Sequence, residues 1–168
     1  GGQNAMIVDS SALPEQVVED VIHSAFTSAG QRCSALRVLY LQEDIADKII
    51  EVLSGAMQEL RLGNPTDLST DVGPVIDMAA REELQSHIDE LKAAGKFIAE
   101  TPMPEGLEGH GSFLSPVAFE IDHINDLDQE WFGPIVHIVR YKAKDLDSVI
   151  DQINDYGFGL TLGVHSRN

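Results

Sequence analysis

The sequence predicts an α/β fold with a mainly parallel sheet flanked by helices. Short runs of branched apolar residues alternate with amphipathic helical patterns along the chain. Glycine- and proline-containing breaks separate many of these patterns. The 168 residues are 43% hydrophobic and 23% charged. A chain of this length and composition can bury one hydrophobic core without disulfide bonds or metal ions. We therefore expect one α/β domain over residues 1–168.

The first elements are a short strand and a helix. Ala5 to Val8 is an apolar run typical of a buried strand. Pro14-Glu15 opens a helix, since proline suits the first turn and an acidic side chain suits the helix dipole. Ala29-Gly30 ends it, because glycine is common just after a helix. Its apolar residues recur at helical spacing and are Val17, Val18, Val21, Ile22, Ala25 and Phe26.

The middle of the chain continues the alternation. Ala35 to Leu41 is rich in branched apolar residues and is expected to be a strand. A second helix is expected from about Glu43 to Leu60, ended by Gly63-Asn64-Pro65. The polar stretch from Asn64 to Pro74 is expected to be a surface loop. A third helix is predicted from about Met78 to Ala94, with Gly95 after it.

The last third supplies four more strands and one helix. Two prolines and three glycines predict a loop from Pro102 to Gly111. The helix is expected over Asp145 to Asn154. The strands are expected over Lys96 to Ala99, Phe113 to Glu120, Ile135 to Tyr141, and Leu160 to Val164.

Composition excludes several classes of function. Eleven basic and 28 acidic residues give a net charge of −17, which disfavours nucleic acid as a partner because phosphate backbones are negative. No apolar run approaches the ~20 residues of a membrane span, and no signal peptide is visible. The one cysteine cannot form an internal disulfide, which favours a reducing compartment such as the cytoplasm.

Both ends of the sequence look cut. Gly1-Gly2 leads directly into an apolar strand without an initiator methionine, and a strand-like run reaches Asn168 without a closing helix. We expect a domain excised from a longer chain. The alternative is a natural short protein with a processed N-terminus.

The candidate chemistry is concentrated at Cys33. It lies between a helix and a strand, where α/β proteins often place reactive groups. Small neighbours leave room for a substrate, and Arg32 could help hold the thiolate that attacks carbonyl carbons. The alternative is an inert buried cysteine, which is common for a free thiol.

Four segments resemble motifs of the aldehyde dehydrogenase superfamily, in the same order. Gly1-Gly2-Gln3-Asn4 resembles the glycine pair that follows the family's general-base glutamate, and the segment 30–35 (Gly-Gln-Arg-Cys-Ser-Ala) resembles its nucleophile motif. Residues 130–134 (Glu-Trp-Phe-Gly-Pro) match the motif Glu-x-Phe-Gly-Pro, and residues 156–164 resemble the segment near the substrate entrance. The resemblance implies the fold of that family's catalytic domain.

The sequence around Cys33 resembles one branch of this superfamily most closely. It is similar to the glutamate-semialdehyde (1-pyrroline-5-carboxylate) dehydrogenase modules of bacterial proline utilization A proteins. That resemblance implies NAD-dependent oxidation of L-glutamate γ-semialdehyde to L-glutamate in proline catabolism. Other branches that act on semialdehydes carry similar cysteine motifs, so another semialdehyde remains an alternative, as does NADP in place of NAD.

The resemblance also implies residue roles. Cys33 would be the nucleophile, forming a thiohemiacetal and then a thioester while NAD accepts a hydride. The Cys33 backbone N–H would help hold the oxyanion, and Ser34 would contact the substrate. Glu130 would bind the ribose hydroxyls of the cofactor, and Phe132 would pack on its nicotinamide end. Without the motif, Glu130 reads as a solvated carboxylate, Phe132 as a core aromatic and Ser34 as an ordinary turn residue.

The same resemblance implies what the chain lacks. The general base, most of the NAD-binding domain and the C-terminal part of the catalytic domain would lie outside residues 1–168. We therefore expect these residues alone to be inactive or nearly so. The parent could carry FAD in a separate proline dehydrogenase domain and form homo-oligomers.

The sequence predicts no metal site, and it leaves two other functions open. The six histidines show no metal-ligand spacing with one another or with Cys33, so no metal is expected. They are His23, His87, His110, His123, His137 and His165. A cysteine-dependent hydrolase would need a histidine base near Cys33, for which no local signature exists. A non-catalytic assembly module derived from such an enzyme is the third possibility.

Overall fold

The structure is a computed structural model, and it confirms the α/β fold with a mainly parallel sheet. It describes residues 4–26, 35–64, 66–67, 70–75, 77–107, 112–127, 129, 131–156 and 162–167. The sheet has six strands in the order β3-β4-β5-β2-β1-β6. Every neighbouring pair is parallel except β3 with β4. The strands are β1 (Ala5–Val8), β2 (Val38–Gln42), β3 (Phe97–Glu100), β4 (Val117–Glu120), β5 (Ile135–Tyr141) and β6 (Leu162–His165).

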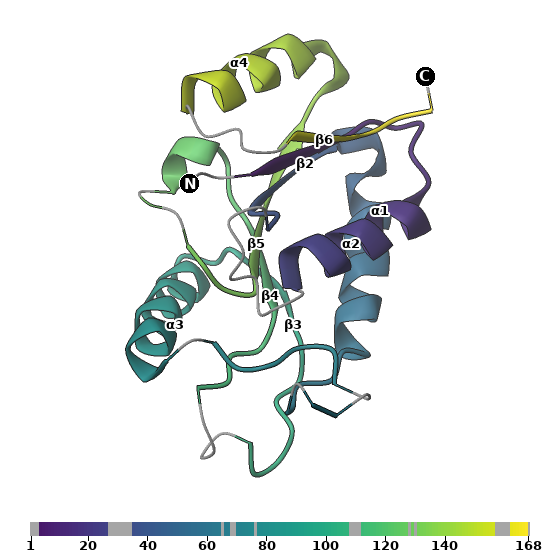
Figure 1. Cartoon of the computed structure of the whole chain (residues 1–168). Helices are drawn as coiled ribbons and strands as arrows, with labels where there is room; N and C mark the ends of the chain where they lie inside the picture. Colours follow the sequence, from purple (N-terminus) through teal and green to yellow (C-terminus); the bar gives the residue numbers. More distant parts are fainter. Residues whose placement is uncertain are drawn as a thin grey trace.

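Helices cover both faces of the sheet (Figure 1). On one face lie α1 (Pro14–Val21), continued by the π-helical η1 (Ile22–Phe26), and α2 (Glu43–Gln58). On the other lie α3 (Met78–Ala93) and α4 (Leu146–Tyr156). Two 3₁₀ turns, η3 (Ile124–Asp126) and η4 (Ala143–Asp145), flank β5 in sequence.

Alternating residues of each central strand pack into two different hydrophobic cores. Met6 and Leu39 pack in the core under α1 and α2, whereas Ile7 and Tyr40 pack with Val149 of α4. This division follows from the period of two in a strand. Apolar residues occur at successive positions because both faces are covered, as in other parallel sheets.

Local sequence signals fix most element ends. Pro14 occupies the first turn of α1, and the side chain of Asp77 accepts a hydrogen bond from the Ala80 N–H at the start of α3 (2.7 Å). Gly95 follows α3 with φ of +76°, a conformation that glycine adopts without a steric penalty.

One expected strand is shorter than the sequence suggested. The apolar run from Phe113 to Glu120 is a strand only from Val117. Pro116 has no N–H to give to a ladder, and its carbonyl oxygen accepts from the Thr101 N–H instead (2.9 Å). The expected strand over Ala35 to Leu41 likewise begins only at Val38.

Candidate functional site

The motif segments lead into adjacent parallel strands. Segment 1–4 precedes β1, segment 30–35 precedes β2, segment 130–134 precedes β5, and segment 156–164 runs into β6. These strands are neighbours in the order β5-β2-β1-β6 and all run in the same direction. The described residues that border the segments therefore gather at one edge of the sheet, the amino ends of the strands.

Hydrogen bonds join the borders of the first two segments. The side-chain amide of Asn4 donates to the carbonyl oxygen of Ala35 (3.1 Å). In return, the backbone N–H groups of Arg37 and Val38 donate to the carbonyl oxygen of Asn4 (3.0 and 3.1 Å). Asn4 is buried, with 1% of its surface exposed. This side chain thus fixes the start of β1 against the start of β2.

Arg37 joins the second segment to the third. Its side chain is fully buried, and its Nη1 donates to the carbonyl oxygen of Gly133 (3.0 Å). The guanidinium carbon lies 5.2 Å from the ring centroid of Phe132, within the range of a cation–π contact. A buried hydrogen bond from a charged donor is stronger than a neutral one, so this contact holds residues 132–133 near the start of β2.

Gly133 is required for close packing at the same place. A Cβ atom added there would lie 2.6 Å from Cδ1 and 2.9 Å from Cδ2 of Leu84 on α3. The helix can approach residues 131–133 this closely only because position 133 carries no side chain.

Of the predicted site residues, Phe132 is the one that the structure describes. Its exposed fraction is 43%, so the interpretation of Phe132 as a core aromatic is wrong. It borders a hollow of about 210 Å³ lined by Ala80, Glu83, Leu84, Gln129 and Trp131. Cys33, Ser34 and Glu130 lie outside the described residues, and their roles stay predictions. An exposed aromatic ring with a buried cation on one side suits a flat nicotinamide ring on its free surface.

Two buried histidines lie behind this edge. Nε2 of His87 on α3 is 3.0 Å from Nε2 of His137 on β5. Burial lowers the pKa of His137 from 6.5 to about 3, helped by the nearby His87 and Arg37 and opposed by a hydrogen bond to the Arg37 backbone. His137 is therefore neutral at physiological pH.

Sequence reasoning singled out neither Arg37 nor the two histidines as site residues. A signal existed for Arg37 and His137, because each interrupts an otherwise apolar strand. Such an interruption in a doubly covered sheet indicates a buried polar group, which must be hydrogen-bonded. His87 carries no comparable signal, since it lies on a largely polar helix.

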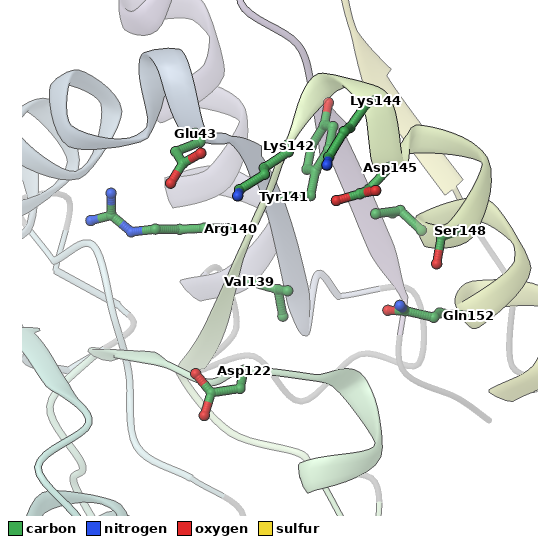
Figure 2. A pocket seen from close by; sticks show the side chains of 11 residues that line it. Glu43, Asp122, Val139, Arg140, Tyr141, Lys142, Lys144, Asp145, Ser148 and Gln152 are labelled. Carbon is green, nitrogen blue, oxygen red and sulfur yellow. The ribbon is translucent and has the colours of Figure 1, made fainter.

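A second hollow lies at the opposite edge of the sheet, at the carboxyl ends of β4, β5 and β2 (Figure 2). Its volume is about 350 Å³, and charged side chains such as Glu43, Lys142 and Asp145 line it. Open parallel sheets usually bind ligands at this edge. Among the described residues, none of those that line it belongs to a motif segment.

No group of three or more His, Cys, Asp or Glu side chains among the described residues could hold a metal ion. No helix in that part of the chain is long and apolar enough to cross a membrane.

Comparison with known proteins agrees with the placement of the motifs. A sequence model of the aldehyde dehydrogenase family matches residues 1–168. The chain belongs to the aldehyde dehydrogenase family. Members of this family oxidise aldehydes and generally use NAD or NADP.

Curated relatives with two different names match nearly the whole chain. "Bifunctional protein PutA" from Klebsiella aerogenes is 53% identical over 171 residues, 99% of this chain and 13% of the relative. "1-pyrroline-5-carboxylate dehydrogenase" from Geobacillus sp. is 34% identical over 170 residues, 100% of this chain and 32% of the relative. The chain thus spans less than a third of the curated relatives named here.

Solved aldehyde dehydrogenases share the fold. A crystal structure of a Bradyrhizobium japonicum proline utilization A mutant superposes with a TM-score of 0.92 at 51% identity, covering 99% of this chain and 17% of that one. A structure of Staphylococcus aureus betaine aldehyde dehydrogenase in complex with NAD⁺ superposes with a TM-score of 0.89 at 29% identity, covering 100% of this chain and 35% of that one.

Proposed function

We propose that residues 1–168 are a catalytic domain of a longer enzyme that oxidises L-glutamate γ-semialdehyde to L-glutamate with NAD. The observation that carries this proposal is that two kinds of relatives match nearly all of this chain. One kind is named 1-pyrroline-5-carboxylate dehydrogenase and the other is named bifunctional PutA. 1-Pyrroline-5-carboxylate is a cyclic imine, and its hydrolysis gives the open-chain γ-semialdehyde, which is an aldehyde substrate of the kind this family oxidises.

Cys33 is the proposed nucleophile. Its thiolate adds to the aldehyde carbon, so that a C–S bond forms and the carbonyl electron pair moves to oxygen. Bound NAD supplies the acceptor for the hydride that leaves this carbon. The product on Cys33 is a thioester, and attack by water breaks the C–S bond to release the carboxylate and restore the thiol.

The remaining proposed residues bind and orient the reactants. Ser34 contacts the substrate beside Cys33. Glu130 accepts hydrogen bonds from the ribose hydroxyls, which suits a carboxylate that can only accept. Phe132 packs on the nicotinamide, and this role is supported by its exposed ring and by the Arg37 contact that holds it. Correct alignment of the two reacting carbons depends on such contacts.

We further propose features of the whole protein. The PutA relatives are named bifunctional, which supports a second activity in the parent, with FAD in a separate proline dehydrogenase domain. The single cysteine supports a reducing, cytoplasmic location. Homo-oligomers are proposed for the parent, and residues 1–168 alone are expected to have little or no activity.

The test uses the full-length parent protein with and without Cys33→Ala. NADH formation is followed with glutamate γ-semialdehyde, succinic semialdehyde and a simple aliphatic aldehyde. We expect Cys33-dependent NADH with a clear preference for glutamate γ-semialdehyde. A preference for another aldehyde would discard the proline assignment. Ester cleavage without NADH from any aldehyde would favour a hydrolase instead.

A matched control separates chemistry from folding. Arg140→Met removes a charged side chain at the carboxyl edge, away from the described residues of the motif segments. We expect this variant to keep its turnover, whereas Cys33→Ala abolishes it. NADH formation that survives Cys33→Ala would contradict the proposed role of Cys33.

A further inference from the structure

His87 and His137 form a hydrogen-bonded pair with a defined direction. Nδ1 of His137 lies 3.3 Å from the carbonyl oxygen of Arg37, and a carbonyl oxygen can only accept, so Nδ1 carries the proton. Because His137 is neutral, its Nε2 is then an unprotonated acceptor. The proton between the two Nε2 atoms, which are 3.0 Å apart, therefore belongs to His87. His87 donates to His137, which donates to the backbone of Arg37.

Trp131 extends this series of contacts to the motif at residues 130–134. Its indole ring stacks on His87 with centroids 4.0 Å apart and an interplanar angle of 11°. Trp131 directly follows Glu130 and directly precedes Phe132 in the sequence. The histidine on α3 therefore holds the residue that lies between the two proposed cofactor-binding side chains.

Arg37 closes the series into a ring of contacts. Its carbonyl oxygen accepts from the backbone N–H (2.9 Å) and Nδ1 of His137. Its guanidinium donates to the carbonyl oxygen of Gly133. Arg37 lies four positions after Cys33. This closed series of contacts therefore links the strand that follows the proposed nucleophile to the segment proposed to hold the cofactor.

We propose that His87 and His137 are positioning residues that fix Trp131, and with it the 130–134 segment, relative to the strand that follows Cys33. This proposal rests on the proposed function, because the geometry that the pair maintains is that between NAD and the reacting aldehyde. Neither histidine touches a reactant. Both links carry the proposal, since Trp131 stacks on His87 and His87 is hydrogen-bonded to His137.

Two substitutions of His87 remove one link each. His87→Phe keeps an aromatic ring under Trp131 and removes the donor to His137. His87→Gln keeps an N–H donor near the Nε2 position and removes the ring. In the full-length enzyme we expect each variant to raise the KM for NAD by roughly 10-fold and to lower kcat, since small displacements of bound reactants cost up to ~100-fold in rate.

A third variant separates positioning from stability. Replacing both partners with apolar rings, in His87→Phe/His137→Phe, leaves neither ring nitrogen buried without a partner, and such double replacements can be nearly neutral for stability. We expect the melting temperature to recover relative to His87→Phe while the KM for NAD stays raised. Recovery of both together would mean that the pair acts through stability alone and would overturn the proposal.

Tyr141→Phe is the matched control. It removes one buried hydrogen bond, from the Tyr141 hydroxyl to the carbonyl oxygen of Val8 (2.9 Å), at the other end of the sheet. Its KM for NAD should match the wild type. Alkylation of Cys33 by iodoacetamide without NAD should proceed at the same rate in all variants. An equal rise in KM for Tyr141→Phe, or an unchanged KM in folded His87→Phe or His87→Gln, would contradict the positioning role.

Hydrogen exchange tests the pair without any turnover. In the full-length protein, the backbone amides of Trp131, Phe132 and Gly133 should exchange faster in both His87 variants and at the wild-type rate in Tyr141→Phe. Unchanged exchange at these amides in the His87 variants would overturn the proposal. Failure of the wild type to oxidise any aldehyde would contradict only the proposed function, because the exchange measurement is independent of activity.

Discussion

The two edges of the sheet each contain an arginine, and the two arginines lie in different surroundings. At the amino edge, Arg37 is fully buried and donates to a backbone carbonyl oxygen. At the carboxyl edge, the Arg140 side chain is 32% exposed and pairs with Asp47 (2.8 Å) and Glu120 (3.0 Å). Asp47 is itself 90% exposed. Arg37 thus makes a buried, directional hydrogen bond, whereas Arg140 makes ion pairs that are partly open to solvent.

The proposed site does not coincide with the larger of the two hollows described above. The carboxyl-edge hollow of about 350 Å³ is larger than the one beside Phe132, at about 210 Å³. Yet the motif segments border the amino edge. Hydrogen bonds are stronger away from water and hold groups in fixed positions, which a reaction between two bound molecules requires. Exposed ion pairs do not give that rigidity.

Replacing Arg37 should have the largest effect. Arg37→Met removes the donor to Gly133 and the cation beside Phe132. The Gly133 carbonyl oxygen keeps its bond from the Ile135 N–H (2.8 Å), so the cost is that of one hydrogen bond from a charged donor, about 1.5–3 kcal/mol. We expect a loss of roughly 100-fold in kcat/KM for NAD in the full-length enzyme. Steady-state kinetics and thermal unfolding measure the two effects. Wild-type kinetics in a folded variant would remove the functional distinction between the edges.

Gly133→Ala should have the next largest effect. The added Cβ would meet Leu84 at 2.6 Å, and overpacking of this kind costs about 1–3 kcal/mol. Adding Leu84→Ala should relieve the clash, so the double variant should bind NAD better than Gly133→Ala alone. A double-mutant cycle on NAD affinity measures this coupling, and additive effects of the two substitutions would show that Leu84 does not limit position 133.

The buried ring of His137 predicts a pH-dependent change in stability that is small at about pH 6 and grows as the pH falls. Because its folded-state pKa is about 3, His137 stays neutral while the unfolded chain takes up a proton below about pH 6.5. Its contribution is therefore complete above about pH 6.5 and is lost as the pH falls toward 3, by at most ~1.4 kcal/mol per pH unit. Melting temperatures of wild type and His137→Phe should converge as the pH falls. A constant difference across this range would contradict the assignment of a neutral buried ring.

Arg140→Met should have the smallest effect. Exposed ion pairs contribute about 0–1 kcal/mol each, so the melting temperature should change little, and high salt should weaken the pairs in the wild type. NADH formation should equal that of the wild type. A loss of activity comparable to that of Arg37→Met would show that the carboxyl edge also serves the reaction.

The sequence predicted the local elements better than their assembly. Ile135 to Tyr141 is a strand with the expected bounds, because a continuous apolar run between breaks is a local signal. The strand order and the antiparallel direction of β3 depend on packing between distant segments, which no local pattern encodes. His87 and His137 are 50 residues apart in sequence, and the side chains that meet across two layers cannot be read from either segment alone.

The candidate site shows the same limit. Four ordered motifs predicted the family, and the family match confirms that prediction. Phe132 was predicted as a cofactor contact, and its exposed ring is compatible with that role. The roles of Cys33, Ser34 and Glu130 remain predictions. Arg37 lies two positions after the segment 30–35, yet only the fold reveals that its guanidinium reaches Gly133.

The separation of Arg37 from Gly133 has a consequence for synthesis in the cell. The two residues are 96 positions apart, and ribosomes add about 5–20 residues per second, so Arg37 emerges about 5–20 s before its partner. Strands β2 and β5 pair across the same interval. During that time the side of β2 that later pairs with β5, and the Arg37 side chain, lack these partners, a state open to aggregation and to capture by chaperones.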